Sequence, residues 1–231
     1  MRHTQGFDHK WYNQELLISL RFCEGTGTIT QDWAKAHHPV TFGGTPTWQN
    51  LANDLTVLEF SGPGSGDEVA CAGGASADLD FTNENFSLAC WCYSTSYTNA
   101  SVIMNRGVLD TCGWEWYGWS SNLATRTNQA GSREGATAVG HLKTNVWQFL
   151  GFVRHGLVGQ MYIDGRPVDT LQTTAGLLDP VACGAQQFLV GNNPHDNGFT
   201  GQLWNPRVWA RQLGEDEMMA MFEEERHLFG L

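Results

Sequence analysis

The chain has 231 residues, of which 27 are glycine, 12% are aromatic and 16% are charged, a composition typical of a turn-rich all-β core in one large domain or two small ones. The net charge is −11, and Lys10, Lys35 and Lys143 are its lysines, which argues against the clustered basic surface that binds nucleic acid. No apolar run is long enough to cross a bilayer and no signal-peptide core opens the chain, so we expect neither a membrane partner nor a secretory leader.

The first thirteen residues have no apolar period and are predicted to form an arm outside a main domain of residues 14–231. Phe7, Trp11 and Tyr12 lie on this arm. Aromatic side chains are costly to leave in water and often act as binding hot spots, so we expect these three to bind a partner. Removal of the arm should then impair assembly rather than folding.

Short strands separated by turn signals are predicted along the rest of the chain. In order, they cover residues 15–22, 41–48, 55–60, 68–71, 86–93, 101–106, 113–120, 147–154, 160–163, 166–169 and 187–191, with a last one beginning at 199. The strand at 113–120 is expected to pair with either 123–128 or 135–139. Asp164-Gly165 predicts a tight hairpin turn. A convincing helix is predicted only at residues 215–225, near the end.

The second half of the chain contains a series of short motifs in a characteristic order. They are Trp147, Tyr162-Ile163-Asp164-Gly165, Val190-Gly191, Phe199-Thr200-Gly201, Arg207-Val208-Trp209, Arg211, Leu213 and Glu217-Met218. This order resembles a laminin G-like domain of the concanavalin A-like lectin/glucanase group, although Trp204-Asn205-Pro206 stands where that family usually has Asp-Glu-Val. The resemblance, like the many short strands, implies one antiparallel two-sheet jelly-roll sandwich with a short C-terminal helix.

Catalysis is tested first, because glucanases share this sandwich. A retaining glycosidase needs two carboxylates about 5 Å apart. The Glu-x-Asp-x-x-Glu pattern of the glucanase branch does not occur, and the acidic run at 215–217 stands at a helix start, where carboxylates complement the helix dipole. We therefore expect a non-catalytic protein, with a glycosidase of unrecognised site as a remote alternative.

Two surfaces are candidates for binding. Strand alternation puts Glu115, Tyr117 and Trp119 on one face, where an acid beside two aromatic rings suits a sugar. The alternative is that this face is core or subunit contact. The second surface is the loop at 191–198, where Asn192 and Asp196, with Asp110 added, offer the oxygen ligands that calcium prefers. The alternative there is ordinary turn chemistry.

Six cysteines leave the question of disulfide pairing open. Cys90 and Cys92 share one face of a predicted strand, and we interpret them as small buried hydrophobic residues rather than zinc ligands.

Three functions compete at this point. The first is a bacteriophage virion component, a capsid decoration or adhesion protein that acts as a homo-oligomer on the virion surface with weak multivalent glycan binding. The second is a free-standing carbohydrate-binding lectin, and the third is the glycosidase. A lone domain with an arm and no export signal favours the first, because a phage protein is assembled without export.

Overall fold

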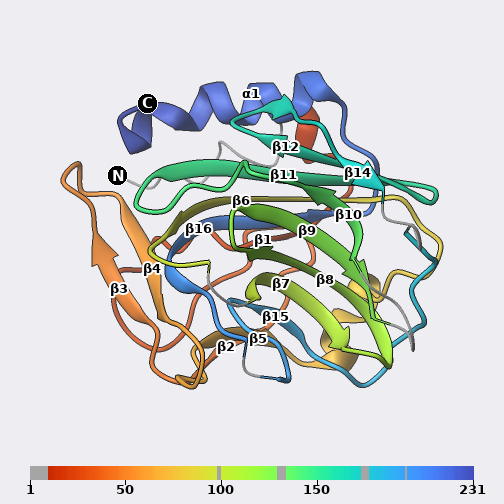
Figure 1. The fold of residues 1–231 in the computed structure, drawn as a ribbon. Helices are drawn as coiled ribbons and strands as arrows, with labels where there is room; N and C mark the ends of the chain where they lie inside the picture. The colour runs from red at the N-terminus through yellow and green to blue at the C-terminus, as the bar shows by residue number, and fades with distance from the viewer. Residues whose placement is uncertain (1–9, 98–99, 129–133, 173–176, 196) are drawn as a thin grey trace.

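The computed structural model describes residues 10–97, 100–128, 134–172, 177–195 and 197–231, and Phe7 and Asp196 therefore lie outside the described residues. The described chain forms two eight-stranded antiparallel sheets packed face to face (Figure 1). Within it, α1 (Glu215–Glu225) is the only α-helix. The predicted two-sheet sandwich with a short C-terminal helix is confirmed. No helix of the described chain is long and apolar enough to span a membrane.

The first sheet has the strand order β13-β12-β11-β6-β16-β4-β3, and β1 also pairs with β16. Its strands are β1 (Leu16–Ser19), β3 (Thr47–Asn50), β4 (Thr56–Ser61), β6 (Phe86–Ser94), β11 (Trp147–His155), β12 (Val158–Ile163), β13 (Arg166–Pro167) and β16 (Thr200–Trp209). The β12–β13 turn contains Asp164 and Gly165, both at positive φ, as the Asp-Gly signal predicts.

The second sheet has the order β14-β10-β9-β8-β7-β15-β5-β2. Its strands are β2 (Val40–Gly43), β5 (Glu68–Cys71), β7 (Ser101–Val108), β8 (Cys112–Trp119), β9 (Asn122–Thr127), β10 (Glu134–Ala138), β14 (Leu171–Gln172) and β15 (Phe188–Val190). β8 pairs with β9, and β9 with β10, which decides between the two partners that the sequence left open.

The main core fills the space between the two sheets. Alternation along β8 directs Trp114 and Trp116 into this core, where both are buried. Cys90 and Cys92 on β6 are free and buried there too, so their interpretation as small hydrophobic residues is confirmed. The inward side chains of β8 thereby determine which of its side chains point away from the core.

A second apolar cluster covers the other side of the first sheet. Helix α1 lies across that side, followed by the 3₁₀ turn η3 (Arg226–Phe229) (Figure 1). Tyr12, in the 3₁₀ turn η1 (Trp11–Asn13), is fully buried in the same cluster, and its hydroxyl donates to Glu224. Tyr12 is thus part of the fold, which corrects the expectation that it is a free anchor on an arm. Trp11 beside it is 54% exposed.

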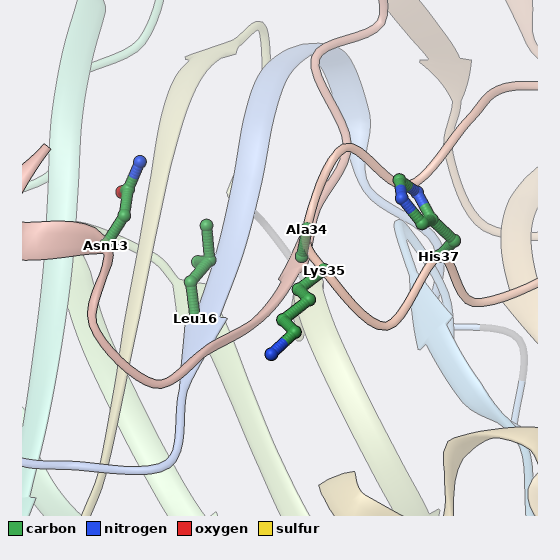
Figure 2. Close-up of a pocket in the computed structure, with 5 residues that line it drawn as sticks. All are labelled: Asn13, Leu16, Ala34, Lys35 and His37. Atoms are coloured by element: carbon green, nitrogen blue, oxygen red, sulfur yellow. The ribbon is translucent and has the colours of Figure 1, made fainter. Parts of the chain in front are cut away.

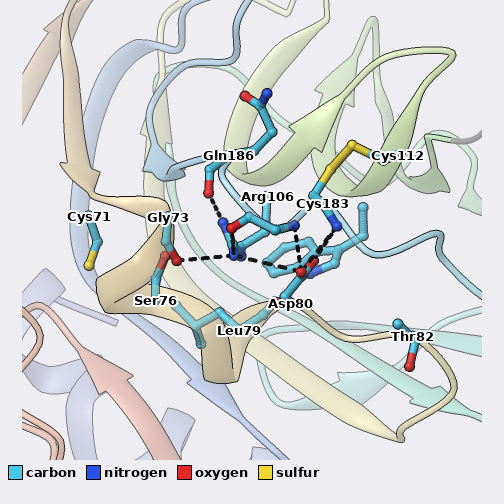
Figure 3. A network of polar contacts seen from close by, with 12 residues as sticks. Cys71, Gly73, Ser76, Leu79, Asp80, Thr82, Arg106, Cys112, Cys183 and Gln186 are labelled. Atoms are coloured by element: carbon cyan, nitrogen blue, oxygen red, sulfur yellow. Dashed lines mark hydrogen bonds and ion pairs between the residues drawn. A yellow bond between two sulfur atoms is a disulfide. The ribbon is translucent and has the colours of Figure 1, made fainter.

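A disulfide and a buried arginine lie where β7 ends and β8 begins, and they connect the second sheet to distant parts of the chain. Cys112 at the start of β8 is bonded to Cys183, 71 residues later. The carboxylate of Asp80 accepts hydrogen bonds from the backbone N–H groups of Cys183 and Gly184, and it lies 3.9 Å from the Arg106 guanidinium (Figure 3). Asp80 follows the 3₁₀ segment η2 (Gly73–Leu79), so this network joins three distant stretches of chain.

Candidate ligand-binding face

The candidate site lies on the side of the second sheet that points away from the core, which we call the outer face. Because Trp114 and Trp116 point inward, Glu115, Tyr117 and Trp119 point outward, as the alternation predicts. In the register of the sheet, Glu115 stands opposite Asn105 on β7 and Arg126 on β9.

Exposure differs sharply among the three outward side chains of β8. Glu115 is 1% exposed and Tyr117 is 2% exposed, whereas Trp119 is 49% exposed. The expectation that all three side chains form an exposed platform is therefore corrected, since of the three only Trp119 is exposed to solvent. Tyr117 instead packs with Val102 and Ala124 in a small cluster on the outer face. Ligand binding by any of the three stays a prediction.

The burial of Glu115 has a specific cause. Arg126 Nη2 donates to Glu115 Oε1, and Asn193 Nδ2 donates to Oε2 at 2.8 Å. The Arg126 guanidinium also lies over the Tyr117 ring, 4.7 Å from its centroid. A buried carboxylate is tolerated when charged and polar donors satisfy it, and both oxygens of Glu115 have such a donor.

Asn193 belongs to the 191–198 loop, so the structure brings the two candidate surfaces together. The loop leaves the sheet where Gly191 N donates to Ile103 O, at 3.0 Å, and returns where Val102 N donates to Asn197 O, at 3.2 Å. Both ends of the loop are thus hydrogen-bonded to β7. Pro194 and His195 are exposed between them. The loop therefore borders the outer face beside the row that contains Tyr117.

Of the predicted calcium ligands, the two that the structure describes, Asp110 and Asn192, do not lie together. Asp110 lies in the exposed turn between β7 and β8, beyond Val108. Val190 pairs with Met104, and the chain continues through Gly191, which is bonded to Ile103, to Asn192. Asn192 therefore lies toward the start of β7, away from Asp110. Asn192 is buried, and its Nδ2 lies 3.5 Å from a carboxylate oxygen of Glu68. Among described residues, no group of three or more His, Cys, Asp or Glu side chains could hold a metal ion.

The surroundings of Trp119 continue the outer face toward the β14 edge. Asn122 stands opposite Trp119, and Leu171 on β14 stands opposite Thr137 on β10. Leu171 is 61% exposed, and Val139, directly after β10, is 55% exposed. The exposed indole thus shares the outer face with exposed apolar side chains, and the 191–198 loop contacts the same face at Glu115, four residues before Trp119 on β8. Such a face combines an aromatic ring with polar groups, which suits an amphipathic ligand.

Two pockets lie away from the outer face. One, of about 260 Å³, is lined by Asn13, Leu16, Ala34, Lys35 and His37 (Figure 2). The other, of about 360 Å³, lies beside the end of the chain and is lined by Leu51, Ala52, Asn53, Trp147, His227, Leu228, Phe229 and Gly230. Asn53 is already engaged there, because its Nδ2 donates to Leu228 O. Neither pocket includes a residue of the predicted sites.

Sequence reasoning missed Arg126 and Asn193. Arg126 had one detectable signal, since it occupies an outward position on the strand that was a candidate partner of β8. Asn193 lies 78 residues from Glu115, and its turn-forming sequence context gives no indication of that contact.

The sequence model of the concanavalin A-like lectin/glucanases superfamily matches residues 64–219, more than half of the chain. Comparison with curated proteins finds no match. Among solved structures, domain 4 of the extracellular arabinanase AbnA from Geobacillus stearothermophilus, in complex with arabinotriose, superposes with a TM-score of 0.70 at 16% identity. The match covers 90% of this chain and 98% of that domain.

Binding domains of botulinum neurotoxins are also similar in fold. The binding domain of neurotoxin DC in complex with rat synaptotagmin II superposes with a TM-score of 0.68 at 15% identity, covering 92% of this chain and 52% of that one. Another such structure concerns the cell entry of botulinum neurotoxin type C, which depends on interaction with two ganglioside molecules. It superposes with a TM-score of 0.67 at 14% identity, with the same coverage. The chain thus spans about half the length of these toxin domains, and the likeness is one of fold.

Proposed function

The chain belongs to the concanavalin A-like lectin/glucanase superfamily, and from this premise we propose that it is a non-catalytic glycan-binding domain whose ligand face is the outer face of the second sheet. The observation that carries the proposal is Trp119, a half-exposed indole on β8, where the other two outward side chains, Glu115 and Tyr117, are buried. An indole is suited to stacking on the apolar face of a sugar ring, and polar groups on the same face are suited to its hydroxyl groups.

The architecture supports this choice of face. Helix α1 covers the other side of the first sheet (Figure 1). The outer face of the second sheet is contacted by a loop, through the hydrogen bond from Asn193 to Glu115. Glu115, the acid nearest to Trp119 along β8, is bonded to Arg126 and Asn193 and is almost fully buried, which suits it poorly to acid–base catalysis. The similarity to an arabinotriose-bound domain and to toxin binding domains further supports binding rather than catalysis.

An oligosaccharide array tests the proposal. The protein is displayed multivalently, because one stacking site binds weakly and many copies gain avidity. Arabinotriose is included in the array. Trp119→Ala should abolish binding, whereas Trp11→Ala, which removes another exposed indole on η1, should leave it intact. If wild type and Trp119→Ala bind equally well, the ligand face lies elsewhere. If the wild type binds no oligosaccharide, the proposed glycan-binding function is wrong.

Calcium is a separate proposal for the loop oxygens of the same face. The array is run in calcium and in a chelator, and loss of binding in the chelator would support a calcium site that includes Asn192. Equal binding in both would contradict it.

Display on a virion or a similar particle, as a homo-oligomer, is a second candidate. It is favoured by Trp11, which is exposed although the adjacent Tyr12 anchors η1 to the domain. An exposed aromatic side chain on a fixed turn is a suitable contact for a partner. The Cys112–Cys183 disulfide supports a place of action outside a reducing cytosol. Trp11→Ala should then weaken oligomerisation in sedimentation experiments, and an unchanged mass would contradict the proposal.

A further inference from the structure

We propose that Glu115 is a positioning residue, which through Asn193 holds the loop backbone at His195 and Asn197 in its ligand-binding shape and does not itself touch the ligand. The proposal rests on the proposed glycan-binding function and assigns a different role to a residue that the sequence suggested as a ligand contact.

The side chain of Asn193 connects the sheet to the loop. Its Nδ2 donates to Glu115 Oε2 at 2.8 Å. Its Oδ1 accepts from the backbone N–H groups of His195, at 3.0 Å, and Asn197, at 3.1 Å. One carboxamide thus uses its donor on the sheet and its acceptor on the loop. The backbone around the exposed His195 is therefore shaped by a contact with the sheet.

The direction of each hydrogen bond in this arrangement, from donor to acceptor, is fully determined. Arg126 donates to Oε1 of Glu115 and Asn193 donates to Oε2, so each carboxylate oxygen has its own donor. Glu115 and Asn193 are 1% and 2% exposed, so water competes little with these bonds. Because the Asn193 oxygen is committed to the loop backbone, its NH₂ group must face Glu115.

This polarity permits a test by inversion of donor and acceptor. In Glu115→Gln, the amide oxygen stays with Arg126, and its NH₂ group then faces the NH₂ group of Asn193, donor against donor. In Asn193→Asp, two carboxylates face each other in a buried site, which is strongly unfavourable. In the double variant, the new amide donates to the new carboxylate, whose other oxygen still accepts from His195 and Asn197.

Two measurements are made on each of four proteins, namely the wild type, the two single variants and the double variant. Hydrogen exchange at the His195 and Asn197 amides reports the shape of the loop, and affinity for the array oligosaccharides, including arabinotriose, reports binding. Each single variant should speed exchange and weaken binding by roughly tenfold, the scale of one lost buried hydrogen bond to a charged group. The double variant should restore both. Glu59→Gln, on the first sheet, serves as the matched control and should change neither.

The outcomes separate this inference from the proposed function. If the wild type binds an oligosaccharide and both single variants bind equally well, Glu115 does not position the site, and the glycan-binding function stands. If the double variant is as weak as the single ones, the loss comes from general damage to the fold, and the inference is overturned. If the wild type binds no oligosaccharide, the proposed function fails and this inference fails with it.

Discussion

Arg207 and Glu225 form a two-pronged ion pair, in which Nη1 and Nη2 of the arginine donate to Oε1 and Oε2 of the glutamate at 2.9 and 2.8 Å. Both side chains are almost fully buried. Trp91 Nε1 and Asn205 Nδ2 also donate to the same carboxylate. Glu225, in the last turn of α1, is thus the main polar contact between the helix and the first sheet.

Glu225→Ala should destabilise the protein severely. The substitution leaves the Arg207 charge buried without its partner, a change that typically costs about 3–5 kcal/mol. Chemical denaturation measures the loss. Glu223→Ala is the control, because its pair with Arg226 is exposed and such pairs contribute about 0–1 kcal/mol. Equal effects of the two substitutions would contradict this account of helix attachment.

Deletion of residues 1–13 should lower the thermal stability of the domain. The deletion removes Tyr12, which is fully buried, and truncation of a large buried aromatic side chain typically costs about 3–5 kcal/mol. Tyr12→Ala alone should reproduce most of the loss, whereas Trp11→Ala should not. A deletion variant that melts at the wild-type temperature would restore the interpretation of Tyr12 as part of a separate arm.

Reduction of the Cys112–Cys183 disulfide should destabilise the fold. The bond closes a loop of 71 residues in sequence separation, for which chain entropy predicts a contribution of about 4 kcal/mol. Denaturant titrations with and without a reducing agent, repeated on Cys112→Ala/Cys183→Ala, measure it. Cys23→Ser removes an exposed free thiol and should have no such effect. Insensitivity of the wild type to reductant would show that the bond is not formed in solution.

Stability should decline as pH rises through the pKa of His38. Nδ1 of His38 lies 2.8 Å from Asp32 Oδ2, and Nε2 lies 2.9 Å from Asp78 Oδ1. The hydrogen bond to Asp32 raises the pKa of His38, burial lowers it, and Asp78 raises it, with a net upward direction. The folded-state pKa thus exceeds the unfolded value of about 6.5. The stabilisation is complete below the unfolded pKa and is lost above the folded one.

His38→Gln is the variant that tests this pH dependence. The difference in unfolding free energy between wild type and variant, measured from pH 6 to pH 9, should shrink as pH increases. A difference that stays constant or grows over this range would mean that the histidine is not held protonated by its two carboxylates.

Local patterns predicted most of the strands because a two-residue period is a local property, although the single stretch expected at 41–48 is two strands, β2 and β3, which belong to different sheets. On β8, alternation correctly separated Trp114 and Trp116 from Glu115, Tyr117 and Trp119. The burial of Glu115 was beyond such reasoning, since it depends on a donor 78 residues away. Alternation specifies which side of a sheet a residue faces, but the loops that cover that side are determined by tertiary structure.

The prediction that placed Tyr12 on a free arm failed for the same reason. Tyr12 has no apolar period around it, and its burial depends on Glu224 and the terminal helix, 212 residues later. β14 comprises two residues and was not predicted, because a pair of residues carries no detectable period. The pairing of Cys112 with Cys183 was left open, since sequence spacing contains no information about distance in space.

Lys10 is bonded to Glu224 on α1, and the chain closes at Leu231, just past η3, so both described ends lie on the helix side of the sandwich (Figure 1). The outer face of the second sheet points in the opposite direction. A tether joined to the chain at Lys10 or at Leu231 would therefore hold the domain with Trp119 directed away from its support. The geometry of the fold thus allows many copies, attached at either of these two points, to face the same target in parallel.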